Sequence, residues 1–128
     1  MEVISLHVDI ISRKTGRSAV QMAAYCAREK LYCEYIGRHF DYSDRHDLVF
    51  HEVMLPDFAP ETFHSSEILW NNVERTEKSR NARLARTIII ALPKELDHDL
   101  HIKMVRQYAQ KFFTQHGMCA DISIHDKG

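Results

Sequence analysis

The sequence has few of the residues that interrupt or divide a chain. Its 128 residues include only four glycines and three prolines, and neither a repeat nor a polar linker separates one part from another. With 45% hydrophobic residues, a chain of this length can bury a single core. We therefore expect one compact domain over residues 1–128.

An excess of charge of either sign is also missing. The formal net charge is −1, although 27% of the residues are charged. Bulk electrostatics therefore do not indicate a nucleic-acid-binding protein, and any such role must depend on local clusters of basic side chains.

Cysteines and long apolar runs are scarce as well. The three cysteines, Cys26, Cys33 and Cys119, have no C-x-x-C spacing, which argues against a disulfide framework and a zinc knuckle. Glu2 and Asp9 interrupt the first apolar stretch, so it does not resemble a signal peptide. No segment approaches the roughly 20 apolar residues of a membrane span. We expect a cytoplasmic protein without membrane contact.

Hydrophobic periodicity predicts alternating strands and helices. Residues 3–11 alternate as a half-buried strand does, and Ser18 with Gln21 matches a capping box that begins a helix running to about Lys30. Further strands are expected over 48–55, with residues 38–42 as a possible partner, over 87–92 as a covered central strand, and over 118–125. Helices are expected from about Ser66 to Arg80 and from Asp97 or Asp99 to just before Gly117.

Two of these strands have one polar face each. The polar face of residues 118–125 is therefore a candidate partner for that of the first strand. Because a sheet with one exposed face is typical of antiparallel pairing, the pattern favours an α+β fold. We expect an antiparallel sheet of about four to five strands with three helices.

Tyr25 is the candidate catalytic residue of the first helix. The apolar stripe that begins at Val20 is expected to pack on the sheet, and at about 100° per residue Tyr25 lies roughly 140° away from it. Basic residues near it, and the amides at the helix start, could bind a phosphate and favour attack on phosphorus. Taken alone, a half-exposed helical tyrosine is more often a surface or interface residue. The nearby basic residues are Arg13, Lys14, Arg17 and Arg28.

Of nine histidines, one stands out by position. His125 ends a predicted strand on the same face as Asp121 and Ser123, where it could serve a metal or be merely exposed. His98 and His101 are spaced i, i+3 on a predicted helix and form a weaker candidate pair.

Several blocks of the sequence carry a family resemblance. In chain order they are SRKTGRSAV, AAY, HEVMLP, ALPKEL and MCADISIHDKG. In this order and spacing the chain resembles the amino-terminal part of plasmid mobilisation relaxases of the MobA/MobL family, which is MobQ-type and TraA-like. That family is a branch of the HUH endonucleases, so the resemblance implies an HUH palm of antiparallel sheet flanked by helices.

The resemblance implies a metal-dependent nicking enzyme. Tyr25 matches the nucleophile, which attacks single-stranded DNA at a plasmid transfer origin and leaves a 5′-phosphotyrosyl intermediate and a free 3′-hydroxyl. His125 matches the first of three histidines that hold Mg²⁺ or Mn²⁺. The expected partners are single-stranded DNA and accessory relaxosome proteins, and the protein is expected to be a monomer. The candidate DNA-binding residues are Arg13, Lys14, Arg17, Arg28, Arg83 and Arg86.

Two departures from the family pattern affect this expectation. The other two metal histidines follow the D-K-G stretch in the family, whereas this sequence ends at Gly128, so we expect a truncated domain with an incomplete metal site and weak activity alone. Many relatives also have glutamates where this chain has Thr87 and Ile89.

Two other hypotheses remain open from the residues. The chain could be a non-catalytic remnant that binds single-stranded DNA through its basic clusters. It could also be a small α+β interaction domain with Tyr25 at a protein contact, in which case it would have no affinity for DNA.

Overall fold

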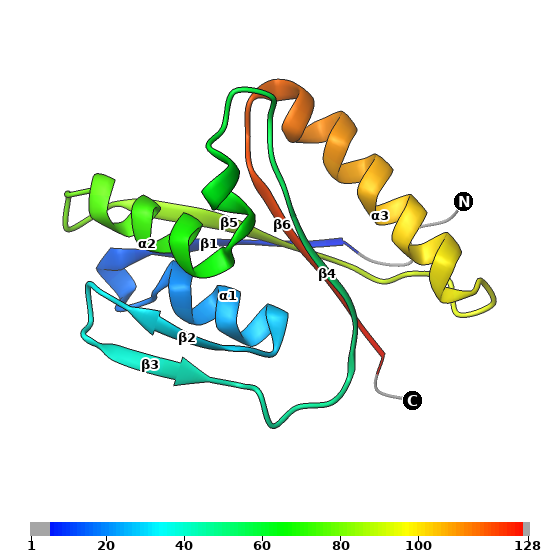
Figure 1. Cartoon of the computed structure of the whole chain (residues 1–128), viewed down its shortest axis with the longest axis horizontal. Helices are drawn as coiled ribbons and strands as arrows, with labels where there is room; N and C mark the ends of the chain where they lie inside the picture. The colour runs from blue at the N-terminus through cyan, green and yellow to red at the C-terminus, as the bar shows by residue number, and fades with distance from the viewer. Residues whose placement is uncertain (1–5, 127–128) are drawn as a thin grey trace.

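The structure is a computed structural model that describes residues 6–126. Within that range, six strands form three antiparallel pairs, and three α-helices pack around them (Figure 1). The predicted α+β class is therefore confirmed. The first residues of the predicted strand over 3–11 lie outside the described residues.

The first pair joins β1 (Leu6–Ser12) to β5 (Arg83–Ile90), with Val8 opposite Ile88 and Asp9 opposite Thr87. The prediction that 87–92 is a covered central strand is wrong. Val8 is 52% exposed and Ile89 is 58% exposed, although they point to opposite faces of the ribbon. A run of β-branched residues cannot by itself reveal whether other elements cover its two faces.

The helix α1 (Ala19–Ala27) follows a short 3-10 turn, Arg13–Thr15, and begins at Ser18. The hydroxyl of Ser18 accepts a hydrogen bond from the Gln21 amide, as predicted, whereas the Gln21 side chain donates to the hydroxyl of Tyr42 instead of completing the capping box. One face of α1 is buried against the hairpin that follows it in the sequence. This core contains Val20, Ala23, Ala24, Leu31, Cys33 and Phe40.

The predicted extension of α1 to Lys30 is wrong. Arg28 adopts a left-handed conformation with φ 54°, which ends the helix, and β2 (Lys30–Cys33) follows. Leu31 is buried, as its place in the helical stripe suggested, but it reaches the core from a strand. β2 pairs with β3 (Arg38–Asp41), so residues 38–42 do not pair with 48–55.

The last strand also has a different partner from the one predicted. β6 (Ala120–His125) pairs with β4 (Leu48–Met54) and not with β1. Leu48 lies opposite His125, and Val53 lies opposite Asp121. Side chains from β4 and from the second helix form hydrogen bonds with the polar face of β6. The polarity of that face could not show whether its partner would be β4 or β1.

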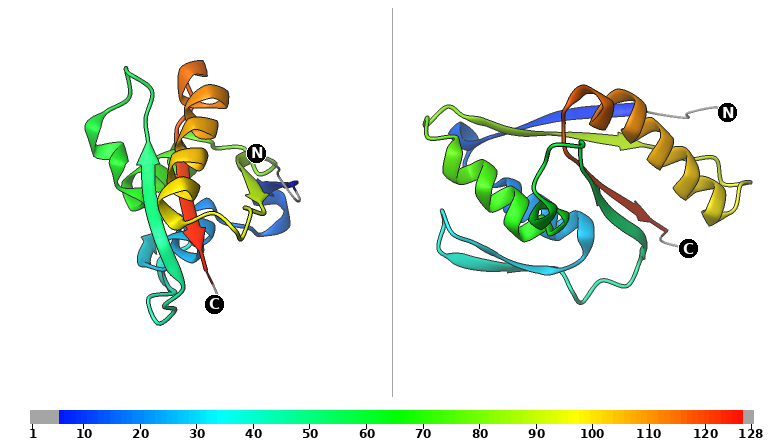
Figure 2. Two further views of the ribbon diagram at one scale, coloured as in Figure 1. Left: turned by 90° about the vertical axis from the view of Figure 1, so that its right-hand side faces the viewer. Right: turned by 45° about the horizontal axis from the view of Figure 1, so that its top comes forward.

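The other two helices complete the molecule. α2 (Ser66–Thr76) is shorter than predicted and lies beside α1, while α3 (His98–Phe112) lies along the β4–β6 pair (Figures 1 and 2). A 3-10 turn, Thr114–His116, separates α3 from Gly117, so Gly117 ends that turn and not the helix. No helix within residues 6–126 is long and apolar enough to cross a membrane.

Candidate active site

Tyr25 lies in the last turn of α1, half-buried, with its ring held by three side chains. The Cζ atom of Arg28 lies 4.6 Å from the ring centroid, and that of Arg45 lies 5.1 Å from it. The ring of Tyr42 meets it edge to face at 5.4 Å between centroids. Two cations therefore border the candidate nucleophile, and one of them comes from the loop before β4.

Arg28 is fixed beside Tyr25 by an ion pair. Its Nε and Nη2 donate to the two carboxylate oxygens of Asp47 at 2.8 and 2.9 Å, and its Nη1 donates to the Tyr25 carbonyl at 2.7 Å. The guanidinium is buried, with only 2% of the side chain exposed. The hydrogen bond to Asp47 is the main reason that the pKa of Arg28 is raised, and the one from Arg28 lowers the pKa of Asp47 to about 2. Both groups therefore stay charged.

His125 is connected to the same helix end. Its Nε2 lies 2.6 Å from the carbonyl oxygen of Cys26, the residue next to Tyr25. A carbonyl only accepts, so Nε2 carries the proton, and Nδ1 is the nitrogen left to bind a metal in the neutral ring. Metal-binding histidines commonly donate their second nitrogen to a carbonyl in this way.

The Cys26 thiol has no sign of reactivity. Burial, and then the negative charge of Asp121, raise its pKa to about 11. The thiol is therefore protonated at neutral pH and acts as a packing group.

A polar cluster lies behind this site, where β4, β6 and α2 meet. His51 Nε2 is 2.7 Å from Asp121 Oδ1, while Ser66 and Trp70 both donate to Asp121 Oδ2 at 2.8 Å. The Ser66 hydroxyl also lies 3.1 Å from that same His51 Nε2. In a hydrolase triad the serine and the carboxylate contact different imidazole nitrogens, so this cluster is not one.

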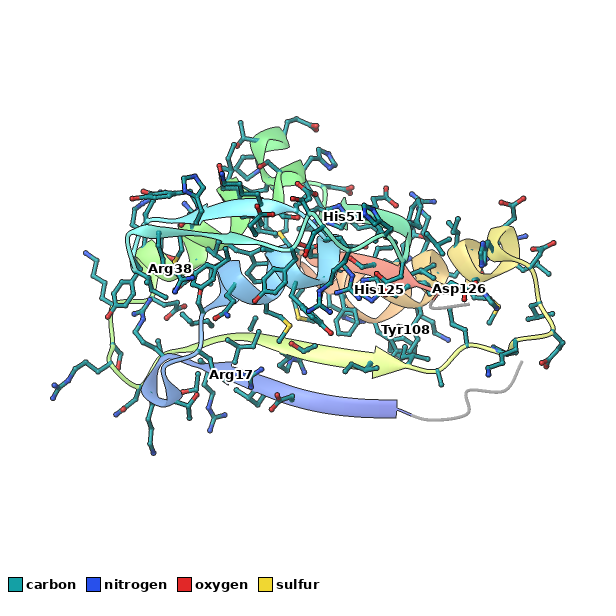
Figure 3. The ribbon with its side chains drawn as sticks, turned by 90° about the horizontal axis from the view of Figure 1, so that it is seen from below. Arg17, Arg38, His51, Tyr108, His125 and Asp126 are labelled. Carbon is teal, nitrogen blue, oxygen red and sulfur yellow. The ribbon has the colours of Figure 1, made fainter. Side chains whose placement is uncertain are left out.

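The predicted basic residues differ in how far they are engaged within the chain. Arg13 donates to the carbonyl oxygens of Glu74 at 2.7 Å and Ser79 at 3.2 Å, and also to that of Glu77, so it fastens the end of α2. Arg17 pairs with Asp9 at 2.7 Å. Figure 3 shows Arg17 by the β1–β5 ribbon, away from His125.

The remaining predicted basic residues are exposed: Lys14, Arg83 and Arg86. Arg86 contacts the Met118 sulfur at 3.6 Å and lies over the Phe113 ring. None of the three borders Tyr25 in the way that Arg28 and Arg45 do.

The amides at the start of α1 do not form an anion site. The buried carboxylate of Glu74 accepts from the Val20 amide at 3.1 Å and from the Ser18 hydroxyl at 2.9 Å. The expectation that this helix end binds a phosphate is therefore wrong, because an internal anion from α2 already fills the position.

No group of three or more His, Cys, Asp or Glu side chains within residues 6–126 is arranged to hold a metal ion. His98 lies 2.9 Å from Asp126, and His101 is 2.6 Å from the Pro93 carbonyl oxygen, so the two histidines contact different groups. His125 alone of these three histidines keeps a ring nitrogen suited to a metal beside the candidate nucleophile.

The two departures from the family pattern lie on the ribbon. Ile89 is exposed, and Thr87 lies opposite Asp9, a carboxylate that Arg17 engages. The position opposite Thr87 therefore carries a carboxylate, that of Asp9, which belongs to β1 and not to β5.

Comparison with known proteins gives the chain its family. The sequence model of the MobA/MobL family matches residues 17–128. The chain belongs to the MobA/MobL family. The conjugal transfer protein TraA of Agrobacterium fabrum is 38% identical over 98% of the chain, and mobilization protein MobL of Acidithiobacillus ferridurans is 34% identical over the same share. The probable mobilization protein MobA of Bifidobacterium longum is 30% identical over the whole chain.

These relatives are longer proteins. The MobA/MobL chain described here covers 12% of the TraA protein, 23% of the MobA protein and 32% of the MobL protein. A solved structure from work on the molecular basis of vancomycin resistance transfer in Staphylococcus aureus matches 98% of the chain with a TM-score of 0.90 and 28% identity, and the chain covers 63% of it. The family resemblance noted from the motifs is therefore confirmed.

Sequence reasoning missed three residues around Tyr25 in this MobA/MobL chain. Tyr42, Arg45 and Asp47 all come from the loop between β3 and β4, which is polar and lacks periodicity. The loop contains charged residues of both signs, but nothing in its local sequence indicated that it folds back onto α1.

Proposed function

We propose that this chain is the nucleophile-bearing part of a DNA relaxase, which cuts one strand of single-stranded DNA at a plasmid transfer origin during conjugative mobilisation. Membership of the MobA/MobL family and the names of the TraA, MobA and MobL relatives support a role in transfer. The observation that carries the proposal is the placement of Tyr25 between two arginines, with His125 bound to the carbonyl of the neighbouring Cys26.

The proposed reaction is a transesterification. The Tyr25 oxygen attacks the phosphorus of a phosphodiester, a new O–P bond forms, and the bond to the 3′ oxygen breaks. The tyrosine proton leaves to water, and the 3′ oxygen gains a proton, so a 5′-phosphotyrosyl enzyme and a free 3′-hydroxyl result. One phosphodiester replaces another, so rejoining needs no ATP.

Arg28 and His125 have separate tasks in this reaction. Arg28 holds a fixed guanidinium against the Tyr25 ring and so helps to orient the attacking side chain. His125 has the proton arrangement of a metal ligand, with Nδ1 available. A divalent metal such as Mg²⁺ or Mn²⁺ would polarise the scissile phosphate when bound.

We propose that residues 1–128 form the amino-terminal portion of the nicking domain. The chain covers 12%, 23% and 32% of the three relatives, which agrees with its being one portion of a longer protein. The partner is single-stranded DNA at the transfer origin, with accessory relaxosome proteins, and the active unit is a monomer.

The proposal is tested by trapping the covalent intermediate. The protein from its full natural reading frame is incubated with Mn²⁺ and end-labelled single-stranded DNA from a candidate transfer origin, and denaturing gels reveal adducts. We expect an adduct with the unmodified protein and none with Tyr25→Phe, because only the hydroxyl is lost. Tyr35→Phe is the matched control, since Tyr35 is 61% exposed and its ring contacts Arg13, whereas the Tyr25 ring contacts Arg28 and Arg45.

Two outcomes contradict the proposal. An adduct that persists in Tyr25→Phe would remove Tyr25 as the nucleophile. Binding of the DNA without any adduct, under conditions in which the transfer origin is known to be cut, would favour a non-catalytic DNA-binding role.

A further inference from the structure

We infer that Arg45, in the loop between β3 and β4, is the side chain that binds the DNA phosphate attacked by Tyr25. The inference rests on the proposed function and adds a catalytic residue to it. No motif pointed to this arginine, and its position follows from contacts that only the folded chain brings together.

The other cation beside Tyr25 is already fully engaged within the chain. Arg28 donates hydrogen bonds from Nε and Nη2 to Asp47 and from Nη1 to the Tyr25 carbonyl, and its side chain is only 2% exposed. A phosphate could reach this guanidinium only by displacing a carboxylate whose pKa is held at about 2. Arg28 therefore contributes a fixed charge and not a binding group.

Arg45 has the opposite properties. It is exposed, and within residues 6–126 the contacts that hold its guanidinium are with two aromatic rings, at 5.1 Å from the Tyr25 centroid and 5.7 Å from the Tyr42 centroid. No carboxylate in that part of the chain forms a salt bridge with it. Its five N–H donors remain available to an incoming anion.

The loop that presents Arg45 is held by hydrogen bonds to α1 and to the two residues that follow it. The Tyr42 amide donates to the Glu29 carbonyl at 3.1 Å, its hydroxyl accepts from Gln21 at 3.2 Å, and the Arg45 amide closes a turn onto the Tyr42 carbonyl at 3.2 Å. Two residues later, Asp47 is held by Arg28. The flexible side chain of Arg45 thus extends from a backbone that is positioned relative to Tyr25.

The chemistry of this arrangement suits a phosphodiester. A guanidinium binds two phosphate oxygens through a planar pair of N–H donors, and it can remain stacked on an aromatic ring while it does so. A donor at that position also meets the charge that builds up on the phosphoryl oxygens as the Tyr25 oxygen attacks. Arg45 would therefore bind the substrate and stabilise the transition state.

The test compares Arg45→Ala, Arg45→Gln and Arg45→Lys with Arg38→Ala. Arg38 is a matched control because it is also exposed and lies 4.7 Å from the centroid of an aromatic ring, that of Phe40, but on β3. Three quantities are measured in the full-length protein: the rate of adduct formation, the salt dependence of binding to uncleavable single-stranded DNA, and the thermal midpoint.

We expect Arg45→Ala and Arg45→Gln to slow adduct formation by about tenfold or more, with a smaller loss in Arg45→Lys, which keeps the charge but not the planar pair of donors. The slope of log Kd against log salt concentration should fall by about 0.7 for one lost phosphate contact with single-stranded DNA. Arg38→Ala should change neither quantity. Arg45→Gln retains a long polar stem, so its thermal midpoint should stay near that of the unmodified protein.

The two proposals fail in different ways. If Tyr25→Phe abolishes the adduct but Arg45→Gln behaves like Arg38→Ala in both rate and salt slope, the inference about Arg45 is overturned and Tyr25 remains the nucleophile. If the adduct persists in Tyr25→Phe, the proposed function fails, and the salt slope alone then decides whether Arg45 contacts phosphate.

Discussion

At the scale of single residues, the pair of Arg28 and Asp47 shows how one interaction serves both stability and the site. It ends α1 in a left-handed conformation, ties the β3–β4 loop to the helix, and leaves a fixed positive charge against Tyr25. The left-handed backbone is unfavourable for a residue with a side chain, and the two hydrogen bonds to Asp47 offset that cost.

Asp47→Asn should therefore destabilise the protein in a pH-dependent way. The pKa of Asp47 is lower in the folded state, at about 2, than its ordinary value of 3.8. The contribution of this carboxylate to folding stability is therefore full above pH 4 and is lost as the pH falls toward 2. We expect the unmodified protein to have a larger free energy of unfolding than the variant at pH 7, and this difference should become smaller below pH 4.

Urea unfolding followed by circular dichroism between pH 7 and pH 3 measures this gap. Asp44→Asn is the control, because Asp44 is exposed in the same loop and forms no ion pair there with the described residues. A gap for Asp47→Asn that stays constant with pH would mean that the charge of this carboxylate does not act through Arg28.

At the scale of elements, α1 is held at both ends by charged side chains from other parts of the chain. Glu74 of α2 accepts a hydrogen bond from the Val20 amide at its start, and Asp47 holds Arg28 at its end. The helix has only nine residues, too few for stability on its own, so these tertiary contacts and the buried alanine face sustain it. The orientation of Tyr25 depends on both.

Ser18→Ala should weaken α1 more than an ordinary cap mutation would. It removes the acceptor for the Gln21 amide and also a donor to the Glu74 carboxylate, which is only 3% exposed. We expect a loss of about 1–3 kcal/mol in the free energy of unfolding.

Ser65→Ala provides the comparison at the start of α2. Ser65 accepts from the Ile68 amide at 3.3 Å, but it is exposed and contacts no buried carboxylate. A loss of about 0.5–1 kcal/mol is expected there. Equal losses for the two variants, measured by chemical denaturation, would contradict the role assigned to Glu74.

At the scale of the whole molecule, the cluster around Asp121 joins elements that are distant in the sequence. His51 comes from β4, Asp121 from β6, and Ser66 and Trp70 from α2. Glu29, two residues after α1, places a carboxylate oxygen 3.7 Å from His51 Nδ1. Figure 3 shows His51 and His125 in the middle of the molecule, where these elements meet. The cluster thus holds β6, and His125 with it, against α1.

Stability should depend on the charge of His51. The hydrogen bond to Asp121 is the main cause that raises the pKa of His51 above 6.5. The contribution of the charged imidazole to folding stability is therefore full below pH 6.5 and is lost as the pH rises through the folded-state pKa. His51→Gln should cost about 1.5–3 kcal/mol at pH 6, and less at pH 9.

Chemical denaturation at several pH values checks this expectation, with His46→Gln as the control. His46 is exposed in the β3–β4 loop and makes no salt bridge with the described residues. A difference for His51→Gln that grows with pH would show that the imidazole is neutral in the folded protein.

The sequence by itself determined what depends on local pattern. Alternation located the strands around Ile10, Val53 and Ile122, and the Ser18 cap located the start of the helix that carries Tyr25. The motifs also determined the family, because their order along the chain is a linear property. Periodicity and capping depend on residues only a few positions apart, so the amino-acid sequence is enough to reveal them.

Only the tertiary structure decided which strands pair and which charges are free. Glu74 fills the helix start, Asp47 engages Arg28, and Arg45 remains open to an anion, although all three belong to segments of similar polarity. The physical reason is that a charged side chain is satisfied by any partner that folding brings within hydrogen-bond distance. That partner can lie 54 positions away in the sequence, as Glu74 does from Val20.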